Sequence, residues 1–256
     1  MIKSFLAVLL VILLQAYSNA QTGSRVLIEE FTETGCGACA QYDSAFQALT
    51  NAYSDKVAVI NYHCFYMLDT FYQYNKACDN RYVQYQLHGY PQAVANGMPG
   101  DLKSTHITGI TRGHLDILYN HEPNYQFEIT AQSTGKKDVH STDIKVKVKA
   151  LKDVPGKDLR LFIAVTENNI NHFERYKSNA VNGINEFNHI LRAFIPTIDG
   201  TPIGEIKAGK SATFKASFTN DDKEINYKEV QIVVFVQDYT SKEVLGTAVM
   251  NEHPFK

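Results

Sequence analysis

The sequence of 256 residues contains no tryptophan, only 4 cysteines, and no apolar stretch long enough to cross a membrane as a helix. The apolar run from Phe5 to Leu14 is about half of the ~20 residues that a membrane-spanning helix needs. An excess of one charge is also lacking, because 25 Lys+Arg face 27 Asp+Glu. The chain therefore offers no large basic field, and we expect no nucleic-acid partner and no transmembrane segment in the mature protein.

What is present is the composition of an ordinary globular protein. With 44% hydrophobic and 20% charged residues, the chain can form a packed core. This composition excludes disordered, collagen-like and disulfide-dense miniprotein classes. The length predicts one large or two modest domains.

The first twenty residues have the pattern of a secretory signal peptide. Lys3 precedes the apolar run, and Ser18 and Ala20 supply small residues at the −3 and −1 positions of a cleavage site. We expect residues 1–20 to be a removable leader and the mature protein to begin at Gln21. Export would place the cysteines where disulfides can form and persist.

Residues 21–122 alternate between strand and helix patterns. Short apolar runs at 26–31 and 57–62 are typical of buried strands. Between them, one face of an amphipathic helix is formed by apolar residues at steps of four, three and four: Tyr42, Phe46, Leu49 and Tyr53. The Asn96-Gly97 pair signals a hairpin, and residues 104–119 are expected to form a last helix. These patterns predict an α/β domain.

After residue 122 the apolar period changes to two, which predicts a β-sandwich domain over 123–256. Strands are expected at residues 127–131, 144–148, 159–165, 214–218, 232–236 and 244–249. Six or seven short strands in this length favour an antiparallel sandwich of immunoglobulin-like type. Residues 168–186 form a long polar insertion between strands, of a kind that is often functional or mobile.

The chemistry concentrates at Cys36 and Cys39, which form a C-x-x-C where a strand turns into a helix. The first sulfur would lie at the helix N-terminus, where partial positive charge favours the thiolate, the nucleophile of thiol–disulfide exchange. The second sulfur, one turn later, would resolve the mixed disulfide. A zinc site, a structural disulfide and a chance pair are the alternatives.

Zinc usually has four ligands, and the sequence has no second C-x-x-C, although His63 and Cys64 could contribute. We therefore expect no metal and no cofactor, whereas a structural disulfide stays open. Cys64 and Cys78 also have two interpretations: a second disulfide, which we favour because export permits it, or two unpaired buried thiols.

Residues 26–39 resemble the active-site segment of the thioredoxin superfamily, and the resemblance extends over about residues 25–121. It implies that Cys36 attacks, that Cys39 resolves, and that Glu30 is a buried acid that relays a proton to the resolving cysteine. An exposed strand-edge carboxylate is the alternative for Glu30. Tyr90-Pro91 would match the cis-proline loop that faces the disulfide and aligns the substrate peptide. Gly35 and Ala38 depart from this pattern, because thioredoxins commonly have Trp and Pro there.

A second resemblance takes in both regions. It is carried by Glu30-Phe31-Thr32 leading into Cys36-Gly37-Ala38-Cys39, by Arg81-Tyr82, Gly89-Tyr90-Pro91 and Asn96-Gly97, by His189-Ile190-Leu191-Arg192, and by the segments at 234–238 and 242–245. These segments are similar to those of the outer membrane protein 28 family. This resemblance implies a thioredoxin-like domain followed by a β-sandwich. It also implies an exported protein of a Gram-negative bacterium, located in the periplasm or at the outer membrane or cell surface, with peripheral membrane association.

Two functions are consistent with these features. The first is a thiol–disulfide oxidoreductase whose partners are the thiols and disulfides of exported proteins. The second is an outer-membrane-associated or surface binding protein of the adhesin type, in which Cys36 and Cys39 form a structural disulfide and the β-sandwich contacts a surface ligand. Fold alone does not separate these functions.

Overall fold

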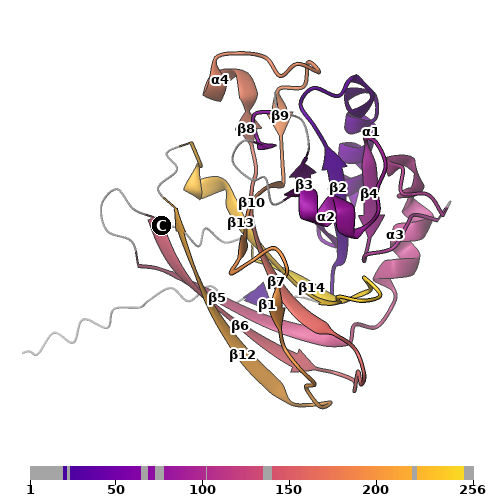
Figure 1. Ribbon diagram of the computed structural model, residues 1–256, viewed down its shortest axis with the longest axis vertical. Coiled ribbons are helices and arrows are strands. Elements are labelled where there is room, and N and C mark those ends of the chain that lie inside the picture. The colour runs from indigo at the N-terminus through magenta and orange to yellow at the C-terminus, as the bar shows by residue number, and fades with distance from the viewer. Residues whose placement is uncertain are drawn as a thin grey trace, which may run out of the picture.

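The protein is seen here in a computed structural model that describes residues 20–21, 24–64, 69–72, 78–101, 103–134, 140–220 and 224–250. The expected leader lies outside the described residues except for Ala20, which pairs with Ile129. The architecture is mixed α/β and dominated by sheets, most of whose pairs are antiparallel, as the sequence predicts at this coarse level (Figure 1).

Within the described residues, the strands form three sheets. An 8-stranded sheet has the order β14-β13-β7-β10-β3-β2-β4, with β11 paired to β7, a 4-stranded sheet has the order β1-β5-β6-β12, and β8 pairs with β9. The strands are β1 (Ala20–Gln21), β2 (Val26–Thr32), β3 (Val57–His63), β4 (Gln92–Ala95), β5 (Tyr125–Ser133), β6 (His140–Ala150), β7 (Leu159–Glu167), β8 (Ile170–Asn171), β9 (Glu186–Phe187), β10 (Ile190–Ile195), β11 (Thr201–Pro202), β12 (Ser211–Asn220), β13 (Val230–Asp238) and β14 (Val244–Met250).

Most helices of the described residues lie in the first half of the chain. The α-helices are α1 (Gly37–Ala52), α2 (Cys78–Gln84), α3 (Arg112–Tyr119) and α4 (His172–Tyr176), and the 3₁₀ helices are η2 (Ile107–Gly109) and η3 (Tyr227–Glu229). The predicted helix face is correct, because Phe46 and Tyr53 of the α1 region pack with Val26 and Ile28 of β2. The single helix expected over 104–119 is instead divided into η2 and α3.

The central strand of the first half is β2, which pairs parallel to β3 and antiparallel to β4. Its side chains are buried on both faces, which explains the continuous apolar run in the sequence. The Asn96-Gly97 pair does form a turn, but it leads to a single bridge between Ala95 and Met98 rather than to a paired strand in the described residues.

The sheet continues from the first half into the second through β10. Ile190 pairs parallel with Asn61 of β3 on one side, and on the other side β10, Ile190 included, runs antiparallel to β7. The Asn61 amide also donates to the carbonyl of His189, at 2.8 Å. Residues on either side of position 122, the expected domain boundary, therefore share one hydrogen-bonded sheet.

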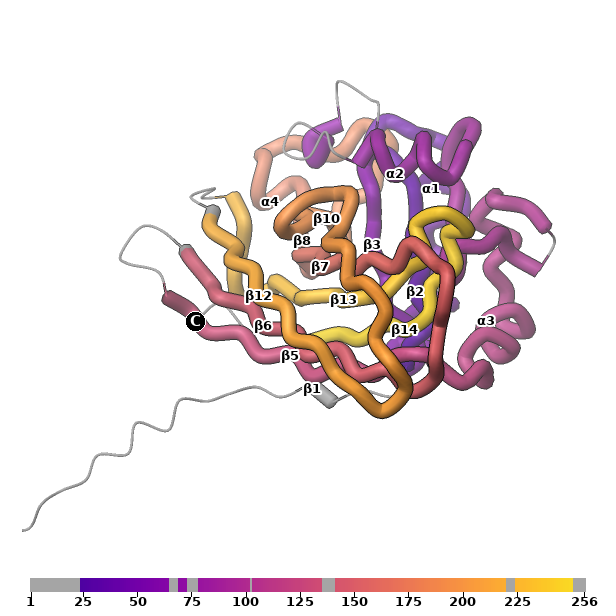
Figure 2. Tube along the Cα trace, turned by 60° about the horizontal axis from the view of Figure 1, so that its bottom comes forward, coloured from indigo at the N-terminus to yellow at the C-terminus, as the bar shows by residue number. Residues whose placement is uncertain are grey.

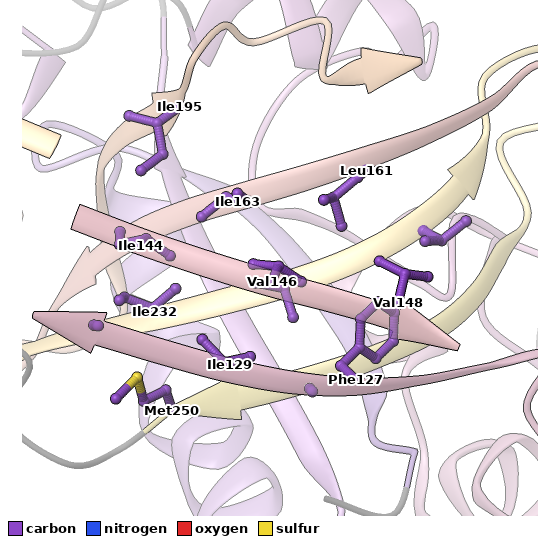
Figure 3. Close-up of a cluster of buried hydrophobic side chains, with 14 of the residues drawn as sticks. Phe127, Ile129, Ile144, Val146, Val148, Leu161, Ile163, Ile195, Ile232 and Met250 are labelled. Carbon is purple, nitrogen blue, oxygen red and sulfur yellow. The ribbon is translucent and has the colours of Figure 1, made fainter. Parts of the chain in front are cut away.

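The second half is built as two packed sheets. Apolar residues from alternate positions of β5 and β6 face those of β7 and β13, as the period of two predicts (Figure 3). This core contains Phe127, Ile129, Ile144, Val146, Val148, Leu161, Ile163, Ile232 and Val234.

The strands β7 and β13 are buried on both faces. Their other alternate residues, including Phe162 and Phe235, belong to a second core with Phe31 and Tyr62 from β2 and β3. The molecule therefore has four layers: the 4-stranded sheet, the β7-β13-β14 part of the large sheet, its β3-β2-β4 part, and the helices α1 and α3. The 4-stranded sheet and these helices lie on opposite sides in Figure 2.

Candidate functional site

Cys36 and Cys39 form a disulfide at the start of α1, with Sγ atoms 2.14 Å apart. Cys36 is the N-cap residue of the helix, and its sulfur accepts a hydrogen bond from the Cys39 amide at 2.9 Å. Cys36 is half-buried, whereas Cys39 is only 3% exposed. The pair therefore combines one half-buried and one buried cysteine, in the electrostatic environment of a helix N-terminus.

Pro91 lies at the same end of the sheet as the disulfide loop. The Tyr90-Pro91 peptide bond is cis, and the register that pairs Phe31 with Gln92 places Pro91 opposite Thr32, the last residue of β2. The Tyr90 hydroxyl donates to the carbonyl of Cys64 at 3.1 Å and so fixes this loop to the end of β3.

Glu30 is a buried acid rather than an exposed strand-edge carboxylate, because only 4% of it is exposed. Burial, together with a smaller effect of the Asp43 carboxylate on α1, raises the pKa of Glu30 to about 8, against a hydrogen bond with Asn61 that lowers it. Burial also raises the pKa of Asp43. Glu30 therefore holds a proton at neutral pH beneath the helix that carries the disulfide.

A buried pair, His63 and Asp69, holds the loop before the disulfide. Nδ1 of His63 lies 2.7 Å from Oδ2 of Asp69, and the same oxygen accepts the Thr34 amide at 2.6 Å. The other carboxylate oxygen accepts the amides of Phe71 and Tyr72. Although burial opposes its ionisation, the His63 ring and the hydrogen bonds lower the pKa of Asp69 to about 2.

The polar insertion at 168–186 also reaches the disulfide loop. It forms β8, α4 and β9 and packs Ile170, Ala180 and Phe187 around Phe71. The Asn182 amide donates to the Thr34 carbonyl at 2.8 Å, and its side-chain Nδ2 donates to the Glu33 carbonyl at 3.2 Å. In Figure 1 this segment lies at the top, beside the loop between β2 and α1.

Cys64 and Cys78 are free thiols, both buried. The structure therefore has the second alternative, two unpaired thiols, in place of the disulfide that we expected. Burial raises the pKa of the Cys64 thiol well above its usual range, and a hydrogen bond with Cys78 adds to this effect. A neutral thiol is a poor nucleophile, so this pair differs chemically from the pair on α1.

Sequence reasoning identified Cys36, Cys39, Glu30 and Pro91 as site candidates, and the structure places all four around the carboxyl end of β2. It did not identify Asp69 or Asn182. Asn182 lies 149 residues beyond the Glu33 carbonyl that it contacts, and periodicity carries no signal for such a contact. The one available sign was the unusual length of the polar insertion.

The family profile described as outer membrane protein Omp28 matches residues 78–252, which is more than half of the chain. The match begins beyond the C-x-x-C, so it covers Cys78 and Pro91 but not Cys36 or Cys39. No curated protein matches the chain in sequence.

Two solved structures are similar to this one. HBP35 of Porphyromonas gingivalis has a TM-score of 0.70 and 18% identity, over 91% of this chain and 76% of that chain. A protein from Agrobacterium tumefaciens has a TM-score of 0.53 and 16% identity, over 90% of this chain and 96% of that chain. At these identities the similarity concerns the fold. Among the helices described, none is both long enough and apolar enough to span a membrane.

Proposed function

Because the chain belongs to the outer membrane protein Omp28 family and is an exported protein of the cell envelope, we propose that it exchanges disulfides with other exported proteins. The observation that carries this proposal is the asymmetry of the pair on α1. Cys36 is half-buried at the helix N-terminus, whereas Cys39 is buried. This is the arrangement of an attacking and a resolving cysteine.

The fold around the pair supports a thioredoxin-like unit. A central strand with one parallel and one antiparallel neighbour leads into a helix that begins at the C-x-x-C. On this proposal, residues 21–122 supply the exchange site, residues 123–256 supply an immunoglobulin-like sandwich, and residues 1–20 are the leader that is removed on export.

Exchange runs through two thiolate attacks. In the reduced protein, the Cys36 thiolate attacks a substrate disulfide, forms a mixed disulfide and releases one substrate thiolate, which takes up a proton. Cys39 then loses its proton and attacks the Cys36 sulfur. The second substrate sulfur leaves as a thiolate, and the Cys36–Cys39 disulfide forms. The substrate has gained two electrons, and the two cysteines have lost them. The oxidised protein runs the same steps in reverse.

Two further residues support these steps. On this proposal Glu30 relays the Cys39 proton. Its protonated form, which predominates at neutral pH, gives a proton to Cys39 when the disulfide opens, and its ionised form, populated as the pH approaches its pKa of about 8, accepts that proton when Cys39 attacks. The loop at Pro91 is the edge along which a substrate peptide is aligned beside Cys36.

The proposal is tested by following the reduction of insulin by dithiothreitol in the presence of the purified mature protein. We expect wild type to accelerate the reduction and Cys36→Ser to abolish the acceleration. Cys78→Ala, which removes a thiol outside the exchange pair, is the matched control and should retain the wild-type rate. If wild type is no faster than Cys36→Ser in either the reducing or the oxidising direction, the protein is not an oxidoreductase.

Partners can be identified with Cys39→Ser, which cannot resolve a mixed disulfide. Expressed in the cell envelope, this variant should accumulate dithiothreitol-sensitive adducts with exported proteins. The double variant Cys36→Ser/Cys39→Ser should form none of them. Adducts at equal abundance on both variants would show that they do not arise from exchange at Cys36.

One observation favours a second function. The family match lies wholly on the C-terminal side of Cys39, so the part of the chain shared with the family does not include the disulfide. This supports a surface or envelope binding protein in which the disulfide is structural and residues 123–256 make the contacts. In that case Cys36→Ser/Cys39→Ser would lower the melting temperature and leave surface binding to host or neighbouring cells unchanged.

A further inference from the structure

The peptide that precedes Cys36 is held from two directions. On one side, the Thr34 amide donates to Asp69 at 2.6 Å. On the other side, the Thr34 carbonyl accepts the Asn182 amide at 2.8 Å. The Glu33 carbonyl accepts both Nδ2 of Asn182, at 3.2 Å, and the amide of Cys36, at 3.3 Å. One carbonyl oxygen is therefore shared between Asn182 and the attacking cysteine.

Hydrogen bonds within the insertion also hold Asn182 in place. Its side-chain Oδ1 accepts the Ile184 amide at 3.0 Å, and the Gly183 amide donates to the carbonyl of Ala180 at 2.9 Å. Ala180 is buried, and Ile184 packs with it against Phe71. The insertion thus delivers two oriented N–H donors to the disulfide loop from a rigid turn.

These donors bear on the charge of Cys36. A thiolate at the N-cap is stabilised by amide N–H groups and by the helix dipole, and it is destabilised by carbonyl oxygens that turn toward it. The carbonyls of Glu33 and Thr34 lie within three residues of Cys36, and Asn182 satisfies both of them. Without the Asn182 side chain, the Glu33 carbonyl loses one of its two donors and with it part of its charge compensation.

We propose that Asn182 is a positioning residue for the exchange pair, so that the insertion between β7 and β10 completes the site on α1. This inference deepens and rests on the proposed exchange function. A segment from the second half of the chain thus stabilises the Cys36 thiolate, and with it the reduced form of the protein.

The inference is tested on two variants. Asn182→Ala removes the Nδ2 donor. Asn182→Asp keeps the acceptor for Ile184 but places an anionic oxygen beside the Glu33 carbonyl. The first readout is the Cys36 thiolate pKa, taken from the pH dependence of the alkylation rate of the dithiothreitol-reduced protein. We expect Asn182→Ala to raise the Cys36 pKa by roughly half to one pH unit, because one hydrogen bond is lost. Asn182→Asp should raise the pKa further, because it also adds a negative charge.

The second readout is the equilibrium with glutathione, in which the protein disulfide and two glutathione thiols give the protein dithiol and one glutathione disulfide. A less stable thiolate destabilises the dithiol, so the equilibrium should move toward the Cys36–Cys39 disulfide. The expected shift for Asn182→Ala is roughly three- to tenfold, which is the effect of one hydrogen bond.

Asn171→Ala is the matched control within the same insertion. The Asn171 side chain caps α4 by accepting the Glu174 amide at 2.9 Å and donates to Glu186 at 2.7 Å. Its loss should lower the melting temperature but leave both readouts within twofold of wild type. If Asn171→Ala shifts them as much as Asn182→Ala, the effect comes from folding of the insertion and the inference is wrong.

The two proposals can fail separately. Unchanged readouts in folded Asn182→Ala and Asn182→Asp, with wild type active on insulin, would overturn the role of Asn182 alone. A wild type that is inactive on insulin, together with shifted readouts in both variants, would overturn the exchange function and retain the positioning contact.

Discussion

Arg81 and Glu29 form a two-point ion pair whose side chains are both completely buried. Nε of Arg81 lies 2.7 Å from Oε1 of Glu29, and Nη2 lies 3.0 Å from Oε2. Tyr62 donates its hydroxyl to the same carboxylate, and Arg81 donates from Nη1 to Gln237 on β13 at 2.8 Å. The pair therefore connects β2 and α2 of the first half to β13 of the second.

Breaking this pair should be strongly destabilising. Arg81→Met leaves the Glu29 carboxylate buried without its cation, so we expect a loss of about 3–5 kcal/mol in the free energy of unfolding, measured by urea denaturation. The double variant Glu29→Leu/Arg81→Met should recover part of this loss, because it leaves no buried charge. A single variant as stable as wild type would show that water reaches the site.

Glu30 should make stability depend on pH. Its pKa rises from 4.5 in the unfolded chain to about 8 in the folded protein, so the folded state binds more protons between these values. Stability should therefore fall as pH rises from 4.5 to 8, by at most ~1.4 kcal/mol per pH unit. Urea denaturation across this range should show the slope in wild type and a smaller slope in Glu30→Gln. Glu174→Gln, a change at an exposed position, should retain the wild-type slope.

The two pairs of cysteines should differ sharply in reactivity. After reduction of the native protein, iodoacetamide should modify Cys36 first, whereas Cys64 and Cys78 should react only after denaturation, because both are buried and the pKa of Cys64 is raised. Peptide mass spectrometry measures this order. Recovery of a Cys64–Cys78 disulfide from the exported protein would contradict the free thiols described here.

Gly97 should not tolerate a side chain. Its φ of 78° is unfavourable for other residues, and an added Cβ would lie 1.7 Å from the carbonyl oxygen of Lys242. We expect Gly97→Ala to lower the free energy of unfolding by about 2–3 kcal/mol, because the turn after β4 and the turn before β14 would have to separate. Thermal denaturation measures this loss. Gly156→Ala is the control: φ is 71° and no atom lies within 4 Å, so only the backbone cost of ~1 kcal/mol is expected. Equal losses of stability in the two variants would show that the backbone at Lys242 moves away from the added Cβ without loss of stability.

The parts of the fold that could be predicted are those set by local periodicity. The strands at 26–32 and 57–63 and the apolar face of α1 follow from runs and spacings within a few residues. The same holds for β5, β6, β7, β12, β13 and β14, whose alternate residues fill the sandwich core. Cys36 and Cys39 stand out because their spacing and position at a helix start have a direct chemical meaning.

The parts that could not be predicted depend on pairing between distant segments. Strand β10 joins the two halves through Ile190 and Asn61, which local patterns do not relate. The pKa of Glu30 depends on its burial and on Asp43 and Asn61 from two other elements, and local patterns relate none of these to Glu30. Asp69 and Asn182 contact only backbone groups of the disulfide loop, and backbone groups are the same in every sequence.

The single sheet that passes through β10 has a consequence for dissection of the chain. A fragment that ends at residue 122 would remove the pairing of Ile190 with β3 and would uncover Phe31 and Tyr62, which share a core with Phe194 and Phe235. An open edge beside an apolar face is a template for association between chains. We therefore expect the first half of the chain to be less stable and more prone to associate on its own than within the full chain.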